Sequence, residues 1–276
     1  MEIDIIIPIF NRAYCLKRTI DSVLAQSYPN WRLWAVNDGS TDETSSILKT
    51  YAKLDQRIQI VETVNGGVSL ARNIGVQQGI APWIAFLDSD DEWLPEKLEI
   101  QMNFTTHSPQ SKFVFCDEIW IRNNKQVQQK AHQKKQGGNL FLRSLETCLI
   151  GASTVIMKRD LYQEMKGFDI SYPVCEDYNL WLKILSLYEV DFISRPLVKK
   201  YGGHPDQLST QFKAMDLWRI KSLEWILENR TLSPSDSEAV RAELVKKAEI
   251  LALGYEKYRH QEKLAEIQTL LVKYKN

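Results

Sequence analysis

The feature that most constrains this chain is the stretch from Trp83 to Asp91, where five apolar residues lead directly into a group of carboxylates. A short, continuous apolar run of this kind is typical of a strand buried on both faces, as in a mostly parallel α/β sheet. Open α/β sheets bind their ligands beyond the carboxyl ends of the strands, which is where Asp88 and Asp90 would lie. The stretch therefore predicts an α/β fold with an acidic site at one edge of the sheet.

Three carboxylates within four positions repel one another strongly unless a cation lies between them. Asp88 and Asp90 are therefore candidate ligands for a hard divalent cation that shares its coordination shell with phosphate oxygens. The alternative for an isolated acidic pair is a polar turn that caps the following helix. The rest of the chain has to decide between the two interpretations.

Strand and helix patterns alternate through the first part of the chain. Apolar runs predict strands at residues 3–10, 31–36 and 57–62 before the strand at 83–87, and helical spacing lies between them. Pro8 cannot donate to a strand ladder, so we expect pairing to stop there. Ser40 and Glu43 resemble a capping box at the start of the second helix. The alternation predicts a parallel, Rossmann-like half.

The following segment is less regular. Patterns predict a helix from Pro95 to about Thr106, a short helix at residues 160–165 and another that begins at Glu176. Residues 122–138 are polar and rich in Gln and Lys, without an apolar period. They predict a mobile surface loop, with a gate or an anion-binding loop as the alternative. Strands are expected at residues 113–120, 152–157 and 190–201.

Beyond about residue 207 only helical patterns remain, at roughly 211–228, 234–258 and 261–274. Ser233 precedes a proline, as at a capped helix start. The favoured interpretation is that these helices pack on the α/β domain, and a homodimer contact or a membrane surface stays open. We therefore expect a domain at 1–206, with a nucleotide-binding half at about 1–91 and an acceptor half at about 92–206, and a helical extension at 207–276.

Charge and composition exclude several classes of protein. Lys plus Arg equals Asp plus Glu at 35 each, so no global field attracts nucleic acid. The four cysteines are scattered without paired spacing, which fits a reducing compartment. No apolar run approaches the ~20 residues of a transmembrane helix. These features predict a cytoplasmic protein and leave open peripheral contact with the inner face of a membrane.

Five motifs occur in an order that points to one family. Four of them lie at predicted strand ends or in the crossovers that follow, and the fifth begins the helix at Glu176. In this order the chain closely resembles family 2 glycosyltransferases of the GT-A fold, over about residues 3–210. The motifs are Pro8–Arg12, Asn37–Ser40, Asn65–Gly75, Asp88–Asp90 and Glu176–Lys183.

The resemblance implies a nucleotide-diphosphate sugar donor, with UDP favoured, and a Mg²⁺ or Mn²⁺ ion. Asp90 would bind the metal, and a histidine near the metal or diphosphate in relatives corresponds to His204. Each of three residues has an alternative to ligand contact. His204 would be a lone surface histidine, Asp38 a turn residue and Arg72 the partner in a structural ion pair. The positions implied to contact the nucleotide sugar are Pro8, Phe10, Asn11, Asp38, Asn65, Arg72, Asp88 and Ser89.

The same resemblance implies that Asp177 is the general base and that Glu176 orients the base or the acceptor. A sugar hydroxyl is a poor acid, so a positioned carboxylate lowers the barrier by taking its proton during attack. Asp177 lies at an expected helix N-terminus, where the helix dipole favours the ionised form. The alternative is that both acids only stabilise the first turn. Attack opposite the leaving diphosphate would invert the anomeric carbon.

Three other kinds of function are the alternatives. A nucleotidyltransferase or a Rossmann oxidoreductase needs a glycine-rich loop after the first strand, and Pro8–Asn11 contains no glycine. A catalytically silent nucleotide-sugar-binding scaffold that acts through its helical tail stays open. The chain lacks the Gln-x-x-Arg-Trp motif of processive synthases, which favours transfer of a single sugar. A glycan, a lipid-linked glycan or a protein would each fit as the acceptor.

Overall fold

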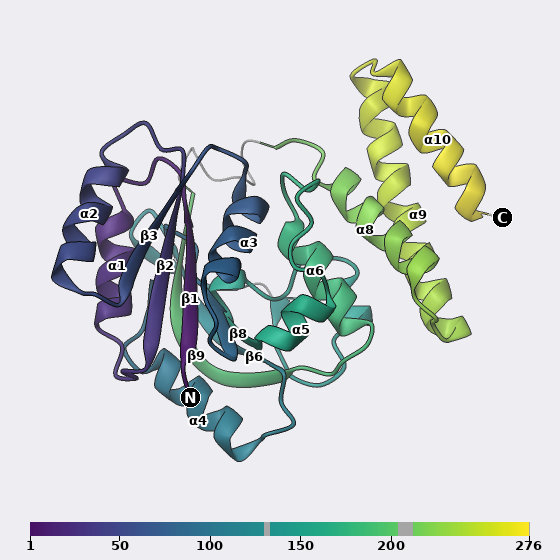
Figure 1. The fold of residues 1–276 in the computed structure, drawn as a ribbon. Helices are drawn as coiled ribbons and strands as arrows, with labels where there is room; N and C mark the ends of the chain where they lie inside the picture. The colour runs from purple at the N-terminus through teal and green to yellow at the C-terminus, as the bar shows by residue number, and fades with distance from the viewer. Residues whose placement is uncertain (130–132, 204–211, 276) are drawn as a thin grey trace. The chain divides into compact units, whose positions relative to one another are not determined.

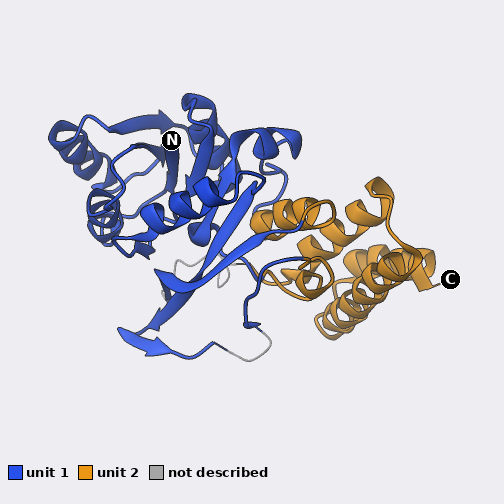
Figure 2. Ribbon diagram, turned by 90° about the horizontal axis from the view of Figure 1, so that it is seen from below, with its two compact units in different colours: residues 1–138, 149–173, 189–204 blue, residues 139–148, 174–188, 205–276 orange. Residues whose placement is uncertain are grey.

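The computed structural model describes residues 1–129, 133–203 and 212–275, and these form two compact units (Figure 2). We call the first the sheet unit, which consists of Met1–Gly138, Leu149–Pro173 and Glu189–His204. The helical unit consists of Asn139–Cys148, Val174–Tyr188 and Pro205–Asn276. The expected boundary at residue 206 lies close to one of these divisions. Segments 139–148 and 174–188, however, group with the C-terminal helices and not with the sheet.

All the strands of the described residues belong to one sheet in the sheet unit, in the order β3-β2-β1-β4-β8-β6-β9-β5, with β7 paired to β6. The first four strands are parallel to one another, and β8 joins β4 in the antiparallel sense. The predicted α/β architecture is therefore confirmed. The strands are β1 (Ile3–Ile9), β2 (Trp31–Asp38), β3 (Ile58–Thr63), β4 (Trp83–Phe86), β5 (Glu92–Trp93), β6 (Phe113–Arg122), β7 (Lys125–Val127), β8 (Val155–Lys158) and β9 (Asp191–Gly202).

Helices cover both faces of the parallel strands (Figure 1). Ile5 and Ile7 of β1 share a buried core with Leu16 and Ile20 of α1, because alternate residues of a strand point to the same face. α3 packs on the opposite face. The helices of the sheet unit are α1 (Leu16–Leu24), α2 (Thr44–Leu54), α3 (Val68–Gln78), α4 (Lys97–His107), α5 (Arg159–Glu164) and the 3₁₀ turn η3 (Ala152–Thr154).

Gly75 explains how closely α3 approaches the sheet. A Cβ atom at this position would lie 2.7 Å from Cγ2 of Ile6 and 3.0 Å from Cγ2 of Val36. Only a residue without a side chain lets the helix backbone lie this near to β1 and β2. The second half of α3 therefore packs directly on β1 and β2.

Two local expectations were wrong. Pairing does not stop at Pro8, because β1 continues along β2 with Pro8 opposite Val36. Along a strand, the backbone N–H and C=O groups of alternate residues point toward the same neighbouring strand. The carbonyl of Ile6 accepts from the N–H of Leu87 on the side of β4, so the N–H that Pro8 lacks would also point to that side. The pairing of β1 with β4 has already ended at Ile6. Ser40 does not cap α2 either, since its hydroxyl accepts a hydrogen bond from the N–H of Asn11.

Residues 122–138 are more ordered than a mobile loop, as far as they are described. Lys125–Val127 forms β7 against β6, and the ammonium of Lys135 is buried in an ion pair with Glu118 at 2.8 Å. Residues 130–132 lie outside the described part of the chain. The polar composition therefore concealed a short hairpin and a buried lysine.

The helical unit contains five described segments, and α8 packs against both α6 and α9. Ser233 caps α9 as predicted: its hydroxyl accepts from the N–H of Asp236, and a proline follows at the first helical position. None of the described helices is both long enough and apolar enough to span a bilayer. The segments are η2 (Leu142–Ser144), α6 (Glu176–Leu185), α8 (Asp216–Asn229), α9 (Pro234–Lys257) and α10 (Gln261–Lys275).

Candidate active site

The acidic loop that follows β4 is held by hydrogen bonds from α1. The hydroxyl of Thr19 donates to the carbonyl of Ser89 at 2.9 Å and to that of Asp91 at 2.8 Å. The guanidinium of Arg18 donates to the carbonyl of Asp90. These contacts are made to backbone oxygens, and the side chain of Asp90 is partly exposed.

Asp88 is oriented by an arginine from α3. The carboxylate lies 2.7 Å from Nη2 of Arg72, whose side chain is 4% exposed, whereas that of Asp88 is 31% exposed. The N–H of Asp88 donates to the hydroxyl of Ser153. An ion pair between Arg72 and an acid was an alternative from the sequence, and the structure contains it. The predicted nucleotide contact of Arg72 stays a prediction.

Asp91 is the buried member of the group. Its carboxylate accepts from the hydroxyl of Ser153 at 2.7 Å and from the N–H of Tyr201 at 3.0 Å. Burial raises the pKa of Asp91 well above its usual range, and the nearby charges of Asp90 and Asp88 raise it further. A cation bound beside the loop would relieve this repulsion.

The donor set suits a hard divalent ion whose shell is completed from outside the protein. Asp88 and Asp90 offer partly exposed carboxylate oxygens, the ligands that Mg²⁺ prefers. Within the described ranges, no three His, Cys, Asp or Glu side chains form a complete metal-binding group. Phosphate oxygens and water would have to supply the other ligands. His204, the second predicted metal ligand, lies outside the described residues.

Asp38 shapes the turn before α3. Its two carboxylate oxygens accept from the N–H groups of Gly66 and Gly67, each at 2.9 Å, and the side-chain amide of Asn65 donates to the carbonyl of Asp38 at 3.0 Å. Gly67 has φ +88°, a conformation that glycine adopts without strain. Asp38 thus has a structural role that the sequence suggested only as a turn residue, and contact with a base remains a prediction.

The turn after β1 is joined to the loop after β2. Thr41 donates its N–H to the side-chain oxygen of Asn11 at 2.8 Å, and Asn11 itself has φ +52°. Phe10 beside it is 44% exposed, so its ring is partly open to solvent. Pro8 lies inside the buried strand. The structure therefore brings the predicted donor residues to adjacent strand ends of the sheet unit.

The predicted catalytic pair opens α6 in the helical unit. Asp177 accepts from the N–H of Tyr178 at 2.7 Å and from the thiol of Cys148 at 3.5 Å, and its side chain is half-buried. Glu176 is buried. Cys175 precedes them with φ +60°, a left-handed conformation that is uncommon outside glycine. Burial, together with the charge of Asp177, raises the pKa of the Cys175 thiol to about 12, so the thiol is neutral at pH 7.

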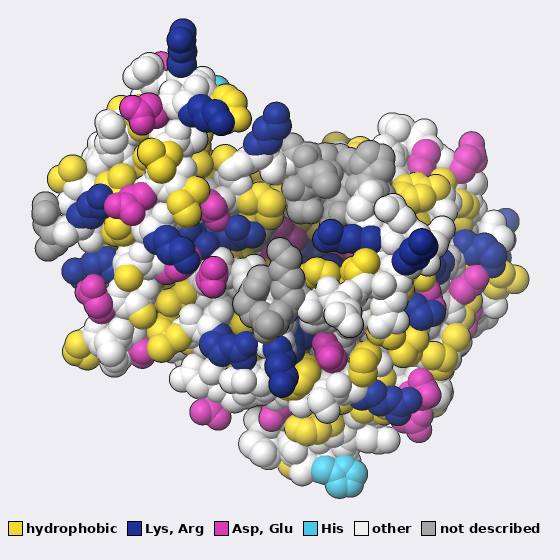
Figure 3. All heavy atoms as spheres, turned by 180° about the vertical axis from the view of Figure 1, so that it is seen from behind, with side chains coloured by type: hydrophobic (Ala, Val, Ile, Leu, Met, Phe, Trp, Pro, Cys, Tyr) yellow, Lys and Arg dark blue, Asp and Glu magenta, His cyan; other side chains and the backbone are white. Residues whose placement is uncertain are grey.

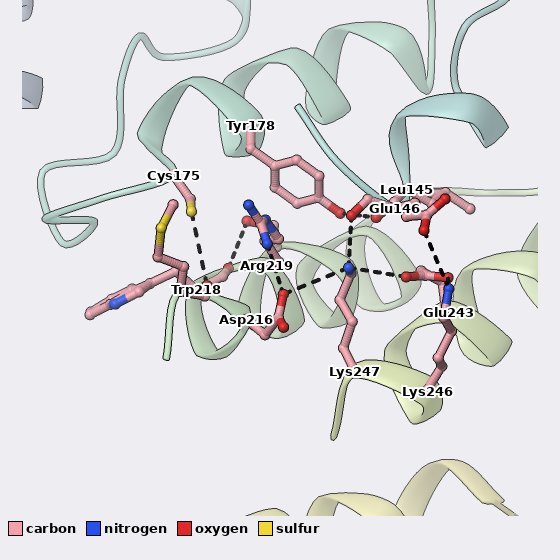
Figure 4. Close-up of polar contacts among 12 residues, drawn as sticks. Leu145, Glu146, Cys175, Tyr178, Asp216, Trp218, Arg219, Glu243, Lys246 and Lys247 are labelled. Atoms are coloured by element: carbon pink, nitrogen blue, oxygen red, sulfur yellow. Dashed lines mark hydrogen bonds and ion pairs between the residues drawn. The ribbon is translucent and has the colours of Figure 1, made fainter. Parts of the chain in front are cut away.

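A buried polar network joins α8 and α9 to the segment before α6 (Figure 4). The ammonium of Lys247 donates to the carbonyl of Glu146 at 2.8 Å and lies 3.0 Å from Glu243 and 3.7 Å from Asp216. Arg219 pairs with Asp216 at 2.9 Å. These contacts fix the C-terminal helices to the part of the helical unit that carries Asp177.

Sequence reasoning missed the residues that position the acidic loop. Thr19 and Ser153 lie far from the loop in sequence, and small hydroxyl residues give no pattern of their own. The one available signal in the sequence was a polar residue, Thr19, on a helix face that is otherwise apolar, directly before Ile20. In the structure Thr19 is fully buried.

Charged side chains of both signs are interspersed over the face in Figure 3, in line with the balanced composition.

A sheet that is parallel in its first half, with carboxylates directly after β4, agrees with the predicted GT-A fold class. S. aureus TarS 1–349 has this fold, with a TM-score of 0.71 at 18% identity over 90% of this chain and 71% of TarS. Its complex with UDP-GlcNAc gives 0.72 at 20% identity, over 93% and 73%. At these identities the likeness shows the fold, which confirms the predicted GT-A architecture.

The chain belongs to glycosyl transferase family 2, whose model matches residues 4–165. Escherichia coli WfgD, a UDP-Glc:α-D-GlcNAc-diphosphoundecaprenol β-1,3-glucosyltransferase, is 34% identical over 184 residues, which is 66% of this chain and 69% of WfgD. An uncharacterized glycosyltransferase of Rickettsia felis is 34% identical over 200 residues, 72% of this chain. The chain spans only 32% of that relative's length.

Proposed function

We propose that this protein is a glycosyltransferase that moves one hexosyl or N-acetylhexosaminyl residue from a UDP-sugar to an acceptor hydroxyl during synthesis of a surface glycan. The observation that carries the proposal is the acidic loop at the end of β4, where Asp88 and Asp90 keep partly exposed carboxylates although the loop backbone is held by α1. A structural turn alone has no need for exposed acids fixed in this way. Membership of family 2 supports the same conclusion.

The donor would be held by the sheet unit. Phe10 offers an exposed ring for stacking, and Asp38 holds the Asn65–Gly67 turn after a neighbouring strand. Asp90 and Asp88 would hold Mg²⁺ or Mn²⁺. The ion supplies Lewis-acid stabilisation of the negative charge that builds on the leaving diphosphate.

Transfer requires a base for the acceptor. The acceptor oxygen forms a bond to the anomeric carbon, the bond from that carbon to the diphosphate breaks, and UDP leaves with the electron pair. The proton of the acceptor hydroxyl passes to the carboxylate of Asp177. Tyr178 and Cys148 hold this carboxylate by hydrogen bonds, which supports a fixed orientation for proton transfer. A single displacement of this kind inverts the anomeric configuration.

The acceptor class is suggested by WfgD, which is named for transfer to a GlcNAc-diphosphoundecaprenol. A short-chain GlcNAc-diphospholipid is therefore the first acceptor to offer. The matching donor probes are UDP-glucose and UDP-GlcNAc, because WfgD is named for the first and TarS was crystallised with the second. With a membrane-embedded acceptor of this kind, the protein would act in the cytoplasm, at the inner face of the membrane.

The first experiment measures, by calorimetry, how UDP, GDP and dTDP stabilise the protein against unfolding, each with and without Mn²⁺. Stabilisation by UDP is expected only with metal, and a nucleotide at about 100 times its dissociation constant should add about 2.7 kcal/mol to the free energy of unfolding. Equal binding without metal would remove Asp90 from its role. If none of the three nucleotides binds, the proposal is contradicted and a scaffold protein without enzyme activity is favoured.

A second experiment tests inversion. UDP-glucose carries an α-linked sugar, so the product with the GlcNAc-diphospholipid acceptor should show a β linkage by the proton coupling of its anomeric carbon. An α-linked product would overturn the single-displacement mechanism while leaving glycosyl transfer itself intact.

A further inference from the structure

The short segment from Leu145 to Cys148 is neither helix nor strand, and side chains from two helices hold it (Figure 4). The hydroxyl of Tyr178 in α6 donates to the carbonyl of Leu145 at 2.6 Å. The ammonium of Lys247 in α9 donates to the carbonyl of Glu146 at 2.8 Å. Backbone carbonyls outside regular structure have no ladder to hold them, so these two contacts fix the path of the segment.

Both side chains that hold this segment are buried. Burial raises the pKa of Tyr178 well above its usual range, so the hydroxyl stays protonated and can donate. Lys247 is buried beside two carboxylates, 3.0 Å from Glu243 and 3.7 Å from Asp216. Neither side chain can leave its carbonyl without a buried polar group losing its partner. The path of the segment is therefore well determined.

The segment ends beside the proposed base. The thiol of Cys148 donates to Oδ2 of Asp177 at 3.5 Å, and the N–H of Tyr178 donates to Oδ1 at 2.7 Å. The terminal torsion of an aspartate side chain has broad minima, so a contact at each oxygen is needed to set the plane of the carboxylate. The contact at Oδ1 comes from the same helical turn. The contact at Oδ2 depends on where the segment places Cys148.

One of the two side chains that hold the segment belongs to the C-terminal helices. Lys247 lies 101 positions after Glu146 in the sequence. Its second carboxylate partner, Asp216, begins α8 and pairs with Arg219 at 2.9 Å. Helices α8 and α9 therefore reach the surroundings of the base through a few polar contacts, all within the helical unit.

We propose that the C-terminal helices take part in sugar transfer by positioning the base. Lys247 of α9 holds the segment that ends at Cys148, and Cys148 fixes the carboxylate of Asp177 in the orientation that takes the proton of the acceptor. Cys148 and Lys247 are positioning residues, because they act through Asp177. The inference rests on the proposed function, since Asp177 is the base of that reaction.

The first test changes Cys148 and measures transfer to the GlcNAc-diphospholipid from whichever UDP-sugar the wild type uses. Cys148→Ala removes the donor to Oδ2, so kcat should fall about 10- to 100-fold, whereas KM for the acceptor and the affinity for UDP should not change. A thiol is a weak donor, so the midpoint of thermal unfolding should stay near that of wild type. Cys148→Ser keeps a donor and should recover most of the rate. Thr147→Ala, at the half-buried neighbour, is the control.

The second test asks whether Lys247 acts through Cys148. Lys247→Met removes the contact with Glu146 and should lower kcat without changing the affinity for UDP, at a temperature where the variant is folded. Combined with Cys148→Ala it should be no slower than the slower single variant, because both changes release the same oxygen of the base. Lys247→Gln keeps an N–H donor, so it is the milder variant and its kcat should lie between. Lys246→Met, at an exposed lysine of the same helix, is the control.

The outcomes separate this inference from the proposed function. A wild-type kcat in Cys148→Ala or in the folded Lys247 variants would overturn the inference and leave the glycosyltransferase proposal standing. The same conclusion would follow if Cys148→Ala slowed the residual transfer by Asp177→Asn as much as it slows wild type, because Cys148 would then act on something other than the base. If wild type transfers no sugar and binds no UDP, both proposals are wrong.

Discussion

Two buried lysines, Lys97 of the sheet unit and Lys247 of the helical unit, have different surroundings. Lys97 of the sheet unit is fully buried, with its ammonium 2.6 Å from the amide oxygen of Gln101 and 4.1 Å from the centre of the Trp93 ring. Lys247 of the helical unit lies among the carboxylates of Glu243 and Asp216. Among the described residues, Lys97 is a buried cation with no carboxylate in an ion pair with it, whereas Lys247 is held by ion pairs.

The same difference extends to the candidate functional residues. In the sheet unit, Asp38 is held mainly by backbone N–H groups and Asp91 by a hydroxyl and an N–H, both at strand ends. In the helical unit, the segments around Asp177 are joined by long charged side chains. We therefore expect changes in the sheet unit to act on donor binding and changes in the helical unit to act on turnover.

The largest expected effect is on the base. Asp177→Asn keeps the size of the side chain but cannot take a proton, so the rate of transfer to the GlcNAc-diphospholipid should fall by about 10²- to 10⁴-fold. UDP affinity should not change. Asp236→Asn, in the first turn of α9, is the matched control and should transfer at the wild-type rate. Equal rates for wild type and Asp177→Asn would refute the assignment.

The next effect tests the network of the helical unit. Lys247→Ala leaves Glu243 and Asp216 without their shared cation, which should cost about 3 kcal/mol of unfolding free energy. Hydrogen exchange should accelerate in α8 and α9 but not in β1 or β2. Lys246→Ala is the control, because its ion pairs at 3.3 and 3.7 Å are exposed and should contribute less than about 1 kcal/mol. Equal losses in both variants would show that burial of the network does not matter.

The buried cation of the sheet unit predicts a dependence on pH. Burial lowers the pKa of Lys97 to about 8, from 10.5 when exposed. Between these values the unfolded chain binds more protons than the folded one, so stability rises with pH. Between pH 8 and 10.5, the free energy of unfolding of wild type should rise by up to about 3 kcal/mol relative to that of Lys97→Met, as measured by chemical denaturation. Exposed Lys49→Met should run parallel to wild type, and a flat difference for Lys97→Met would contradict the shift.

The smallest of these effects concerns the metal. Asp90→Ala removes a ligand from the acidic loop without touching its backbone contacts, so UDP affinity in Mn²⁺ should fall at least about tenfold, or about 1.4 kcal/mol. Glu2→Ala, at an exposed acid of the sheet unit, should have no effect. UDP binding to Asp90→Ala that still responds fully to Mn²⁺ would place the metal elsewhere.

Much of the fold was predictable because its signals are local. The apolar runs at 3–10 and 83–87 predicted buried strands, and Ser233 with its proline marked the start of α9. The capping box at Ser40 failed because a long-range contact with Asn11 took the hydroxyl that the helix would have used. The loop at 122–138 misled because Lys135 is stabilised by a carboxylate that is distant in sequence.

The sequence by itself determined the parallel α/β half, the acidic loop and the family, since hydrophobic period and motif order depend only on neighbouring residues. Only the tertiary structure decided which of those residues are tied down and by what. Arg72 forms an ion pair with Asp88, and the hydroxyl of Ser153 accepts from the N–H of Asp88. These contacts join residues that lie 16 to 65 positions apart, and no local pattern records such distances.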